Sequence, residues 1–530
     1  MTKGIRPLAA VVAVAAAAGM AGTAQAANGI DSTALQNAVK VGDKAGTTGI
    51  RRHLRAFQEI ADRKGNNGTR ATATQGHEDS VEYVEQQLAT AGGYWKVSEQ
   101  PFSAAIFEEL APPTLSASPA PSPAWQPNVD FATMDASGSG AVPAGTPIVV
   151  VDFAEPTATA STSSAGCEAG DFTQDLTGKV AVIQRGTCDF GLKARNAQDR
   201  GAKAVIIFNE GTLGDPDRNG LINGTVEGYG VTIPALEATY PAGRYLVDHP
   251  TATVALSATT QTTVLQTRNV IAETTTGRTD RTVISGAHLD SVPEGPGIND
   301  DGSGSATQIE LALQMAKLGV KPVNQVRFIW FSGEEQGLFG STFYADQLTK
   351  TQRANTAAML DFDMLASPNY ALQIYDGDGS EFGVSGPNGS GIVESVFQKF
   401  YDARGLYTER IAFDGRSDYD EFTKVGIPAG GIAAGAEVHK TPFQQSQWGG
   451  VVAEGLAGQF DPCYHLACDA YGIGKHPDNI NDTALDINSD AVAHSVLTFA
   501  STTSSTNGTD KASTNATKTD YEWKGGHRRR

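Results

Sequence analysis

The stretch Gly286–Ala306, GAHLDSVPEGPGINDDGSGSA, decides the fold that we expect for this chain. It follows an apolar run that is typical of a buried strand, and it leads into a segment whose apolar residues recur at helical spacing. Between strand and helix lie His288, Asp290, Asp300 and Asp301. In open α/β sheets, ligands bind just beyond the carboxyl ends of the strands. The stretch therefore predicts an α/β fold with a functional site in this loop.

The two strands expected next along the chain also end in acidic residues. VRFIWF leads into Glu334 and Glu335, and AAMLDF leads into Asp363. Apolar strands that alternate with helices indicate a mostly parallel sheet with helices on both faces. Because the carboxyl ends of parallel strands meet at one edge, we expect these carboxylates beside His288. Gathering buried carboxylates is costly unless a cation compensates their charge.

Composition and the first residues exclude several kinds of partner. The chain has 530 residues, 59 acidic against 40 basic side chains and a formal net charge of −19. Such a charge repels nucleic acid and anionic lipid. Residues 1–26 combine Lys3 and Arg6, an apolar run and a final Ala-Gln-Ala, which is the layout of a secretory signal. No later segment is apolar for long enough to span a bilayer, so we expect a soluble, secreted protein that binds neither nucleic acid nor a membrane.

Changes in composition predict several units along the chain. Two helical stretches precede PPTLSASPAPSPAWQP, which is dense in Pro, Ser and Ala and indicates a connection, and β-rich runs follow it. We expect a signal peptide at 1–26, the N-terminal part of the main domain at 27–130, an inserted β-rich domain at 131–265, the rest of the main domain at 266–500 and a flexible Ser/Thr/Asn-rich tail at 501–530.

The four cysteines fall into two local groups, Cys167 with Cys188 and Cys463 with Cys468. Export permits disulfides, and three pairings of four cysteines are formally open. We favour the two local pairings because each would close a short loop.

A metal centre competes with simpler interpretations of these residues. Asp300 with Asp301 could be turn and N-cap residues, Glu334 and Glu335 could be the solvated start of a helix, and His465 beside a disulfide could be structural. The convergence of three strand ends favours a metal. Two imidazoles and three carboxylates exceed the ligand set of one catalytic zinc ion and suit two ions that share one carboxylate.

Six motifs make the chain resemble the secreted zinc aminopeptidases of the M28 family: GAHLDSV, GINDDGSGSA, FSGEEQGLFGS, DFDMLASPN, GRSDYDEF and CYHLACD. They occur in the family's order, and none is missing. The resemblance implies one zinc ion on His288 and Asp363 and a second on Glu335 and His465, with Asp300 bridging both.

The same resemblance implies roles for further residues. Glu334 matches the general base, and Tyr464 matches a residue that donates a hydrogen bond to the developing oxyanion. Asp290 matches a carboxylate that orients His288 through its other ring nitrogen. Arg416 lies in a motif that lines the substrate site. The chain departs from the family pattern in YGIGKHP, after the last cysteine, which affects the rim of the pocket more than the metal centre.

The middle segment resembles a protease-associated domain. Its residues 166–210, GCEAGDFTQDLTGKVAVIQRGTCDFGLKARNAQDRGAKAVIIFNE, match that module and include its two cysteines. Such domains are β-rich with short helices and often cover the mouth of the active site that they interrupt. The role of this segment rests on analogy alone.

The resemblance predicts an aminopeptidase that removes a large apolar residue from peptides or proteins with a free amino terminus. A carboxypeptidase or a glutaminyl cyclase on the same scaffold stays open, as does a non-enzymatic binding protein built on the protease-associated domain. Asp486 and Asp490, four residues apart on an expected helix, could bind calcium; the alternative is that they are cap and surface residues.

Overall fold

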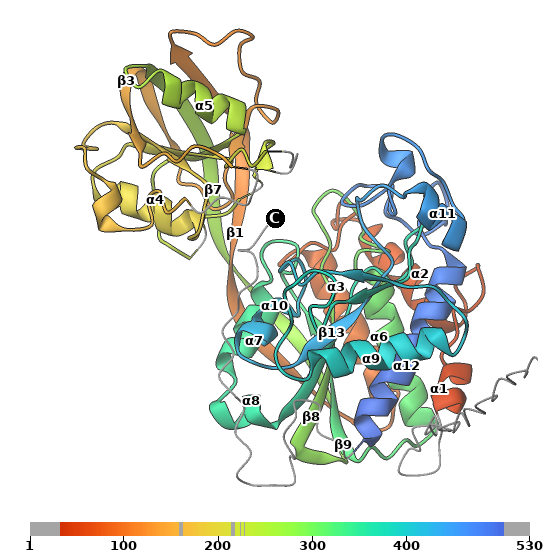
Figure 1. Ribbon diagram of the computed structural model, residues 1–530. Coiled ribbons are helices and arrows are strands. Elements are labelled where there is room, and N and C mark those ends of the chain that lie inside the picture. The colour runs from red at the N-terminus through yellow and green to blue at the C-terminus, as the bar shows by residue number, and fades with distance from the viewer. Residues whose placement is uncertain (1–31, 158–162, 214–217, 223, 227, 503–530) are drawn as a thin grey trace, which may run out of the picture.

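The computed structural model describes residues 32–502 except 158–162, 214–217, 223 and 227. The predicted signal peptide and nearly all of the predicted tail lie outside the described residues. Figure 1 shows two units that are joined by a ribbon of two long strands, β1 (Trp95–Ser118) and β7 (Thr253–Thr274). These strands pair antiparallel from Trp95 opposite Thr274 to Ser118 opposite Thr253. The ribbon enters both units, so it ties one to the other.

The larger unit contains the predicted α/β sheet. Its strands are β8 (Arg278–His288), β9 (Asn324–Phe331), β10 (Thr356–Phe362), β11 (Gln373–Tyr375), β12 (Glu409–Ile411) and β13 (Ala429–Ala433), in the spatial order β12-β11-β13-β10-β8-β9-β7. The central pairs β13–β10, β10–β8 and β8–β9 are parallel. Antiparallel pairing occurs between β9 and β7 and between β13 and β11. The sheet is therefore mostly parallel, as the sequence predicts.

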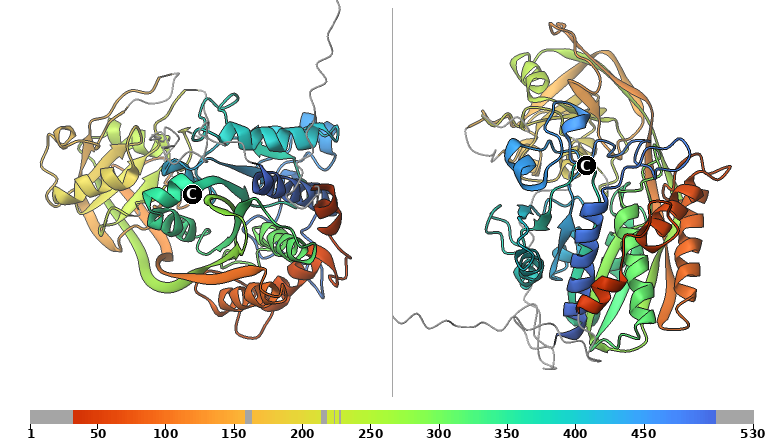
Figure 2. Two further views of the ribbon diagram at one scale, coloured as in Figure 1. Left: turned by 90° about the horizontal axis from the view of Figure 1, so that it is seen from below. Right: turned by 90° about the vertical axis from the view of Figure 1, so that its right-hand side faces the viewer.

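Helices cover both faces of this sheet because the side chains of its strands alternate between two apolar cores. Phe328 and Trp330 face one core, whereas Ile329 and Phe331 face the other. The helices packed on the first core are α1 (Ser32–Ala38), α2 (Gly49–Ala61), α3 (Gln75–Ala89), α6 (Gly302–Lys317), α9 (Ser390–Asp402) and α12 (Asp482–Ser501), seen as a layer in the right-hand view of Figure 2. The second core is covered by α7 (Phe339–Gln347) and α10 (Asp420–Lys424), and α8 (Lys350–Asn355) leads into β10.

The smaller unit continues the strand order beyond β7, as β7-β3-β4-β5-β6-β2, and has two further apolar cores. Its elements are β2 (Phe131–Thr133), β3 (Gly140–Val151), β4 (Val180–Gln184), α4 (Phe190–Asp199), β5 (Ala204–Phe208), β6 (Ala235–Ala238) and α5 (Tyr240–Asp248). The pairs β3–β4, β4–β5 and β5–β6 are parallel, whereas β3 pairs antiparallel with β7 and β6 pairs antiparallel with β2. The disulfide Cys167–Cys188 lies in this unit, and its pairing is the local one that we predict.

The predicted connection after residue 111 is wrong in its first half. Residues 112–118 continue β1 instead of leaving the sheet. Pro112 and Pro113 fall where the register with β7 shifts, between Ala111 and Thr114. Proline lacks a backbone N–H and is tolerated at such an interruption of the ladder. The predicted boundary at 265 falls inside the unbroken strand β7, so the domain limits remain a prediction.

None of the helices in the described part of the chain is both long and apolar enough to cross a membrane.

Candidate metal centre

The structure brings the five predicted metal ligands together at one edge of the sheet. His288 is the last residue of β8, Asp363 directly follows β10, and Glu335 lies in the loop after β9. Asp300 directly precedes the residue that caps helix α6, and His465 lies in the loop closed by the second disulfide. Each side chain is thus placed by a strand end, a helix start or a cross-linked loop.

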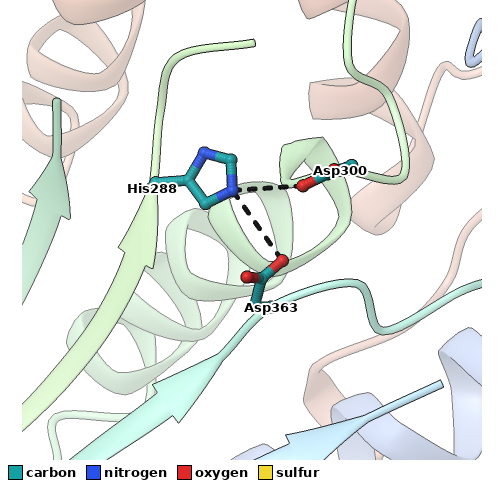
Figure 3. A group of neighbouring side chains, drawn as sticks. All are labelled: His288, Asp300 and Asp363. Atoms are coloured by element: carbon teal, nitrogen blue, oxygen red, sulfur yellow. Dashed lines mark hydrogen bonds and ion pairs between the residues drawn. The ribbon is translucent and has the colours of Figure 1, made fainter. Parts of the chain in front are cut away.

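Asp300 lies between the two imidazoles. Nε2 of His288 is 3.1 Å from Oδ1 of Asp300 and 3.8 Å from Oδ1 of Asp363, as Figure 3 shows. On the other side, Nε2 of His465 is 3.3 Å from Oδ2 of Asp300 and 3.1 Å from Oε2 of Glu335. Asp300 therefore belongs to two groups of three residues, and within each group the candidate ligand atoms all lie within 4.8 Å of one another.

The donor atoms of both groups fit a borderline divalent ion such as zinc, which prefers imidazole nitrogen and carboxylate oxygen. Oε1 of Glu335 and Oδ1 of Asp363 are buried without a hydrogen-bond partner. Buried polar atoms normally have a partner, and a buried carboxylate oxygen without one is costly. A cation in each group would give these two oxygens a partner.

The charges around the site shift the pKa values of its members strongly. Burial and the nearby Asp300 raise the pKa of the Glu335 carboxyl. Burial also raises the pKa of Asp363, to about 7. For His465, burial on its own would lower the pKa, but Glu335 and Asp300 outweigh it and raise the pKa to about 11. A bound cation would supply positive charge here and so favour ionised carboxylates and neutral imidazoles.

The role predicted for Asp290 is only partly correct. Nδ1 of His288 lies 3.0 Å from the main-chain oxygen of Asp290 but 3.8 Å from the carboxylate. That carboxylate instead accepts hydrogen bonds from the backbone N–H groups of Gly333 at 2.9 Å, Glu334 at 3.3 Å and Glu335 at 3.4 Å. Asp290 thus orients His288 through its carbonyl and positions the Glu334–Glu335 loop through its side chain.

Asp301 is the N-cap of helix α6. For this residue the simpler interpretation of the pair Asp300–Asp301, as turn and cap residues, is therefore correct. Its Oδ1 accepts hydrogen bonds from the backbone of Gly304 at 2.8 Å and of Met364 at 3.2 Å. Its Oδ2 accepts one from the backbone of His288 at 3.2 Å. Asp301 therefore fixes the ends of β8 and β10 relative to the start of α6, while Asp300 faces the metal site.

Sequence reasoning misses Arg70, which is fully buried behind the loop that carries Asp290 and Asp300. Its guanidinium donates to the main-chain oxygens of Pro296 at 2.7 Å, Gly297 at 2.6 Å and Leu289. No spacing pattern relates Arg70 to that loop, because 227 residues separate Arg70 from Gly297. Only the folded chain shows that this arginine supports the site.

A second group missed by the sequence analysis flanks the loop of His465. Asp461 and Asp469 lie on either side of the disulfide Cys463–Cys468, and both carboxylates accept hydrogen bonds from the amide of Asn479. The carboxylate of Asp469 also accepts from the backbone of Asp300 at 3.0 Å. These contacts hold the loop of His465 against Asp300. Their placement on both sides of the two cysteines in FDPCYHLACD is the signal that could have revealed them.

Tyr464 and Arg416 lie next to each other, beside the metal groups. The guanidinium of Arg416 donates to the hydroxyl of Tyr464 at 3.2 Å and pairs with Glu437 at 2.8 Å. The ring of Tyr464 stacks on that of His465 with a centroid distance of 3.8 Å. The contact with a cation leaves the hydroxyl hydrogen of Tyr464 available for another acceptor.

These residues open onto one cavity of about 850 Å³. Glu334, Tyr464 and Arg416 line it beside the candidate ligands, and Asp135 and Thr225 of the smaller unit form part of its wall. Burial and the neighbouring Glu335 and Asp363 raise the pKa of Glu334, although the nearby His288 opposes this shift. A carboxylate with a raised pKa beside a metal site suits proton transfer near neutral pH.

A third acidic group, Asp376 with Asp378 and Glu394, is explained by hydrogen bonds to the chain itself. Asp376 accepts from the backbone N–H groups of Ser380, Glu381 and Phe382. Glu394 accepts from Arg410 and from the backbone of Asp378. The group therefore shapes a turn beside the cavity.

Asp486 and Asp490, which we consider as calcium ligands or as surface residues, lie on α12, apart from the candidate metal centre. Asp486 is exposed and Asp490 is half-buried. Within the described ranges, no third Asp, Glu, His or Cys joins them in a group that could hold an ion.

Comparisons with known proteins agree with this architecture. Residues 269–496 match the model of peptidase family M28, and residues 146–246 match the PA domain. The chain is 44% identical over 443 residues to an aminopeptidase of Pseudomonas aeruginosa, covering 83% of this chain and 78% of the relative. It is 36% identical to leucine aminopeptidase 2 of Trichophyton tonsurans, covering 88% and 85%.

Solved structures show the same fold. An aminopeptidase from an Aneurinibacillus species aligns with a TM-score of 0.63 at 26% identity, covering 88% of this chain and 95% of that one. A zinc aminopeptidase from Bacillus subtilis aligns with a TM-score of 0.51 at 22% identity, covering 84% and 94%, and this likeness concerns the fold alone. The chain belongs to peptidase family M28 and carries an inserted PA domain. The predicted α/β fold and the predicted class of enzyme, a peptidase, are thereby confirmed.

Proposed function

We propose that this protein is a secreted aminopeptidase that uses two zinc ions to remove the amino-terminal residue, preferably a large apolar one, from peptides and proteins. The observation that carries the proposal is the position of Asp300, which presents one carboxylate oxygen to His288 and the other to His465. In the proposed site, His288 and Asp363 would hold one ion, Glu335 and His465 would hold the other, and Asp300 would be a ligand of both. The names of the relatives support the activity.

Zinc bound there would act as a Lewis acid toward the scissile carbonyl and its attacking water. Glu334 accepts the proton of that water and returns it to the leaving amine, because its carboxylate lines the cavity and its pKa is raised. The hydroxyl of Tyr464 donates to the oxyanion that develops on the carbonyl, and the adjacent Arg416 strengthens this donor.

The acidic character of the cavity supports exopeptidase action on a free amino terminus. Glu334, Asp414 and Glu437 line it beside the ligands, so an α-ammonium group would be attracted there. Apolar side chains in the same wall, among them Leu338, Tyr375 and Phe382, favour an apolar amino-terminal residue.

Two local disulfides support the proposal that the protein works outside the cytoplasm, where such bonds persist. We propose that Asp486 and Asp490 are surface residues of α12, since no third ligand joins them among the described residues.

Leucine p-nitroanilide and its N-acetyl derivative test the activity. We expect the protein to hydrolyse leucine p-nitroanilide but not its N-acetyl derivative. A chelator should abolish this activity, and added zinc should restore it. Faster cleavage of the acetylated form would contradict the proposal. Release of carboxyl-terminal residues would favour a carboxypeptidase, and cyclisation of amino-terminal glutamine would favour a glutaminyl cyclase.

A further inference from the structure

One carboxylate of the cavity has no part in the proposed metal site. Glu409 begins the edge strand β12 and lines the same cavity as Asp363 and Glu334. It lies away from the metal groups along the sheet. Asp363 directly follows Phe362, which pairs with Ile432, and the next residue, Ala433, pairs with Gln373.

Gln373 in turn pairs with Glu409, so three strand spacings separate Glu409 from the position of Asp363. At about 4.8 Å for each spacing, the two backbone positions are on the order of 14 Å apart. Only a long substrate side chain could reach Glu409 from a residue bound at the metals.

The carboxylate of Glu409 is held in place by neutral groups. The amide of Gln373 donates to Oε1 at 2.9 Å, and the amide of Gln444 donates to Oε1 at 2.9 Å and to Oε2 at 2.8 Å. The carbonyl of Gln444 accepts from the backbone of Thr441 at 2.8 Å, which fixes the direction of its amide. Glu409 is therefore oriented before any substrate arrives.

The side-chain hydrogen bonds found for Glu409 in the described chain come from the amides of Gln373 and Gln444, not from a cation. The charge of Lys440 interacts with that of Glu409. The ammonium of Lys440 is itself committed to the main-chain oxygens of Tyr370 at 2.8 Å and Gly449 at 2.9 Å. A half-buried carboxylate whose hydrogen bonds come from neutral amides would gain from a cationic partner.

The wall that leads toward Glu409 is largely apolar. The apolar residues that line this cavity include Leu338, Met364, Tyr375, Phe382, Ile411 and Phe460. Lysine and arginine carry a long aliphatic stem with a charged end, so they can pack against an apolar wall while the charge reaches a polar group. An apolar wall with a carboxylate at its far end matches that shape.

We propose that Glu409 is a specificity-determining residue that binds the charged end of an amino-terminal lysine or arginine, so that the enzyme accepts long basic residues as well as apolar ones. This inference rests on the proposed aminopeptidase function, and it adds a second class of amino-terminal residue to it.

The test compares p-nitroanilides of leucine, norleucine and lysine in the full-length protein and in Glu409→Gln. Norleucine has the four-carbon side chain of lysine without the terminal ammonium group. We expect the wild type to cleave the lysine substrate, and Glu409→Gln to lower its kcat/KM about 10- to 100-fold, as for loss of one charged hydrogen bond. The kcat/KM values for the norleucine and leucine substrates should change less than about threefold, because these side chains have no charge to pair with Glu409 and a neutral contact contributes little.

Glu381→Gln is the matched control, because Glu381 is an exposed carboxylate on a neighbouring loop that does not line the cavity. It removes the same charge and should leave the preference for lysine unchanged. Glu409→Asp keeps the charge and should retain most lysine cleavage. Leucine hydrolysis reports whether each variant is folded.

Three results would overturn the inference. They are a wild type that cleaves leucine but not lysine, an equal loss on all three substrates in Glu409→Gln, and an equal loss of lysine cleavage in Glu381→Gln. An equal loss on all substrates would place Glu409 at the α-ammonium common to them. A wild type that cleaves none of the three would instead contradict the proposed aminopeptidase function.

Discussion

Arg70 donates a 2.6 Å hydrogen bond to the main-chain oxygen of Gly297, three residues before the bridging candidate Asp300. Its other nitrogens bind the carbonyls of Leu289 and Pro296, so one buried guanidinium spans the loop between His288 and Asp300. Arginine can do this because its donors lie in a rigid planar fork. The metal groups therefore depend on a residue that touches none of their ligands.

Replacing Arg70 with lysine should lower zinc affinity about 10- to 100-fold, as for other groups that orient metal ligands. A lysine ammonium cannot reach all three carbonyls, so the loop and Asp300 should become less well ordered. Competition with a chromophoric chelator measures the affinity without using activity.

Arg51→Lys is the control for this variant. Arg51 is also a buried arginine, 1% exposed, but it binds Asp478 and Asp482 away from the metal loop. Both variants should lose some stability, and only Arg70→Lys should lose zinc affinity. Equal losses of affinity would show that Arg70 acts through general stability alone.

Glu334→Gln should keep both metal ions and lower kcat about 10²- to 10⁴-fold, because an amide cannot accept the proton of the attacking water. Glu334 has no place in either group of candidate ligands, which predicts that the metal content is unchanged. Metal analysis and steady-state kinetics on the same sample separate the two effects. A variant with near-normal kcat would refute the assignment of the base.

Replacing both Cys463 and Cys468 with serine should weaken one metal site more than the other. The loop between them carries His465, whereas His288 and Asp363 lie at strand ends in the sheet. We expect one zinc ion to be lost at lower chelator concentration than in the wild type. The same double change at Cys167 and Cys188, in the smaller unit, should leave zinc binding intact. If the variant without Cys463 and Cys468 lost both ions at the same chelator concentration, the loop of His465 would not support one metal site more than the other.

Asp490→Asn should stabilise the protein at pH 8. Burial and Asp486 raise the pKa of Asp490 from 3.8 to about 6, and its side chain is 24% exposed. A raised carboxyl pKa means that its stabilising contribution is complete below pH 3.8 and is lost as the pH rises through about 6. With solvent screening, the gain at pH 8 should be about 1–2 kcal/mol and should vanish near pH 4.

Urea unfolding at the two pH values measures this difference. An equal gain in the free energy of unfolding at both pH values would mean that removal of the Asp490 charge does not cause the stabilisation. Calcium should leave the stability of both the wild type and Asp490→Asn unchanged; calcium that stabilises only the wild type would show that Asp486 and Asp490 form an ion site after all.

The sequence predicts which candidate ligands gather at this edge because those residues follow strand ends, and parallel strands bring such ends together. His288, Glu335 and Asp363 obey that rule. The residues that support the site cannot be predicted by that rule, because contacts such as that of Arg70 with Gly297 join segments that no periodic pattern relates. Composition also misled us at residues 112–118, where pairing with β7 outweighs the low strand propensity of proline and serine.

The most direct test of the account is the zinc content of the purified protein beside that of Asp300→Asn. We expect about two zinc ions per wild-type chain at saturation. Asp300→Asn should bind both ions much more weakly, because both would share Asp300. One zinc ion per wild-type chain, or an Asp300→Asn variant that binds two ions as tightly as the wild type, would contradict the account.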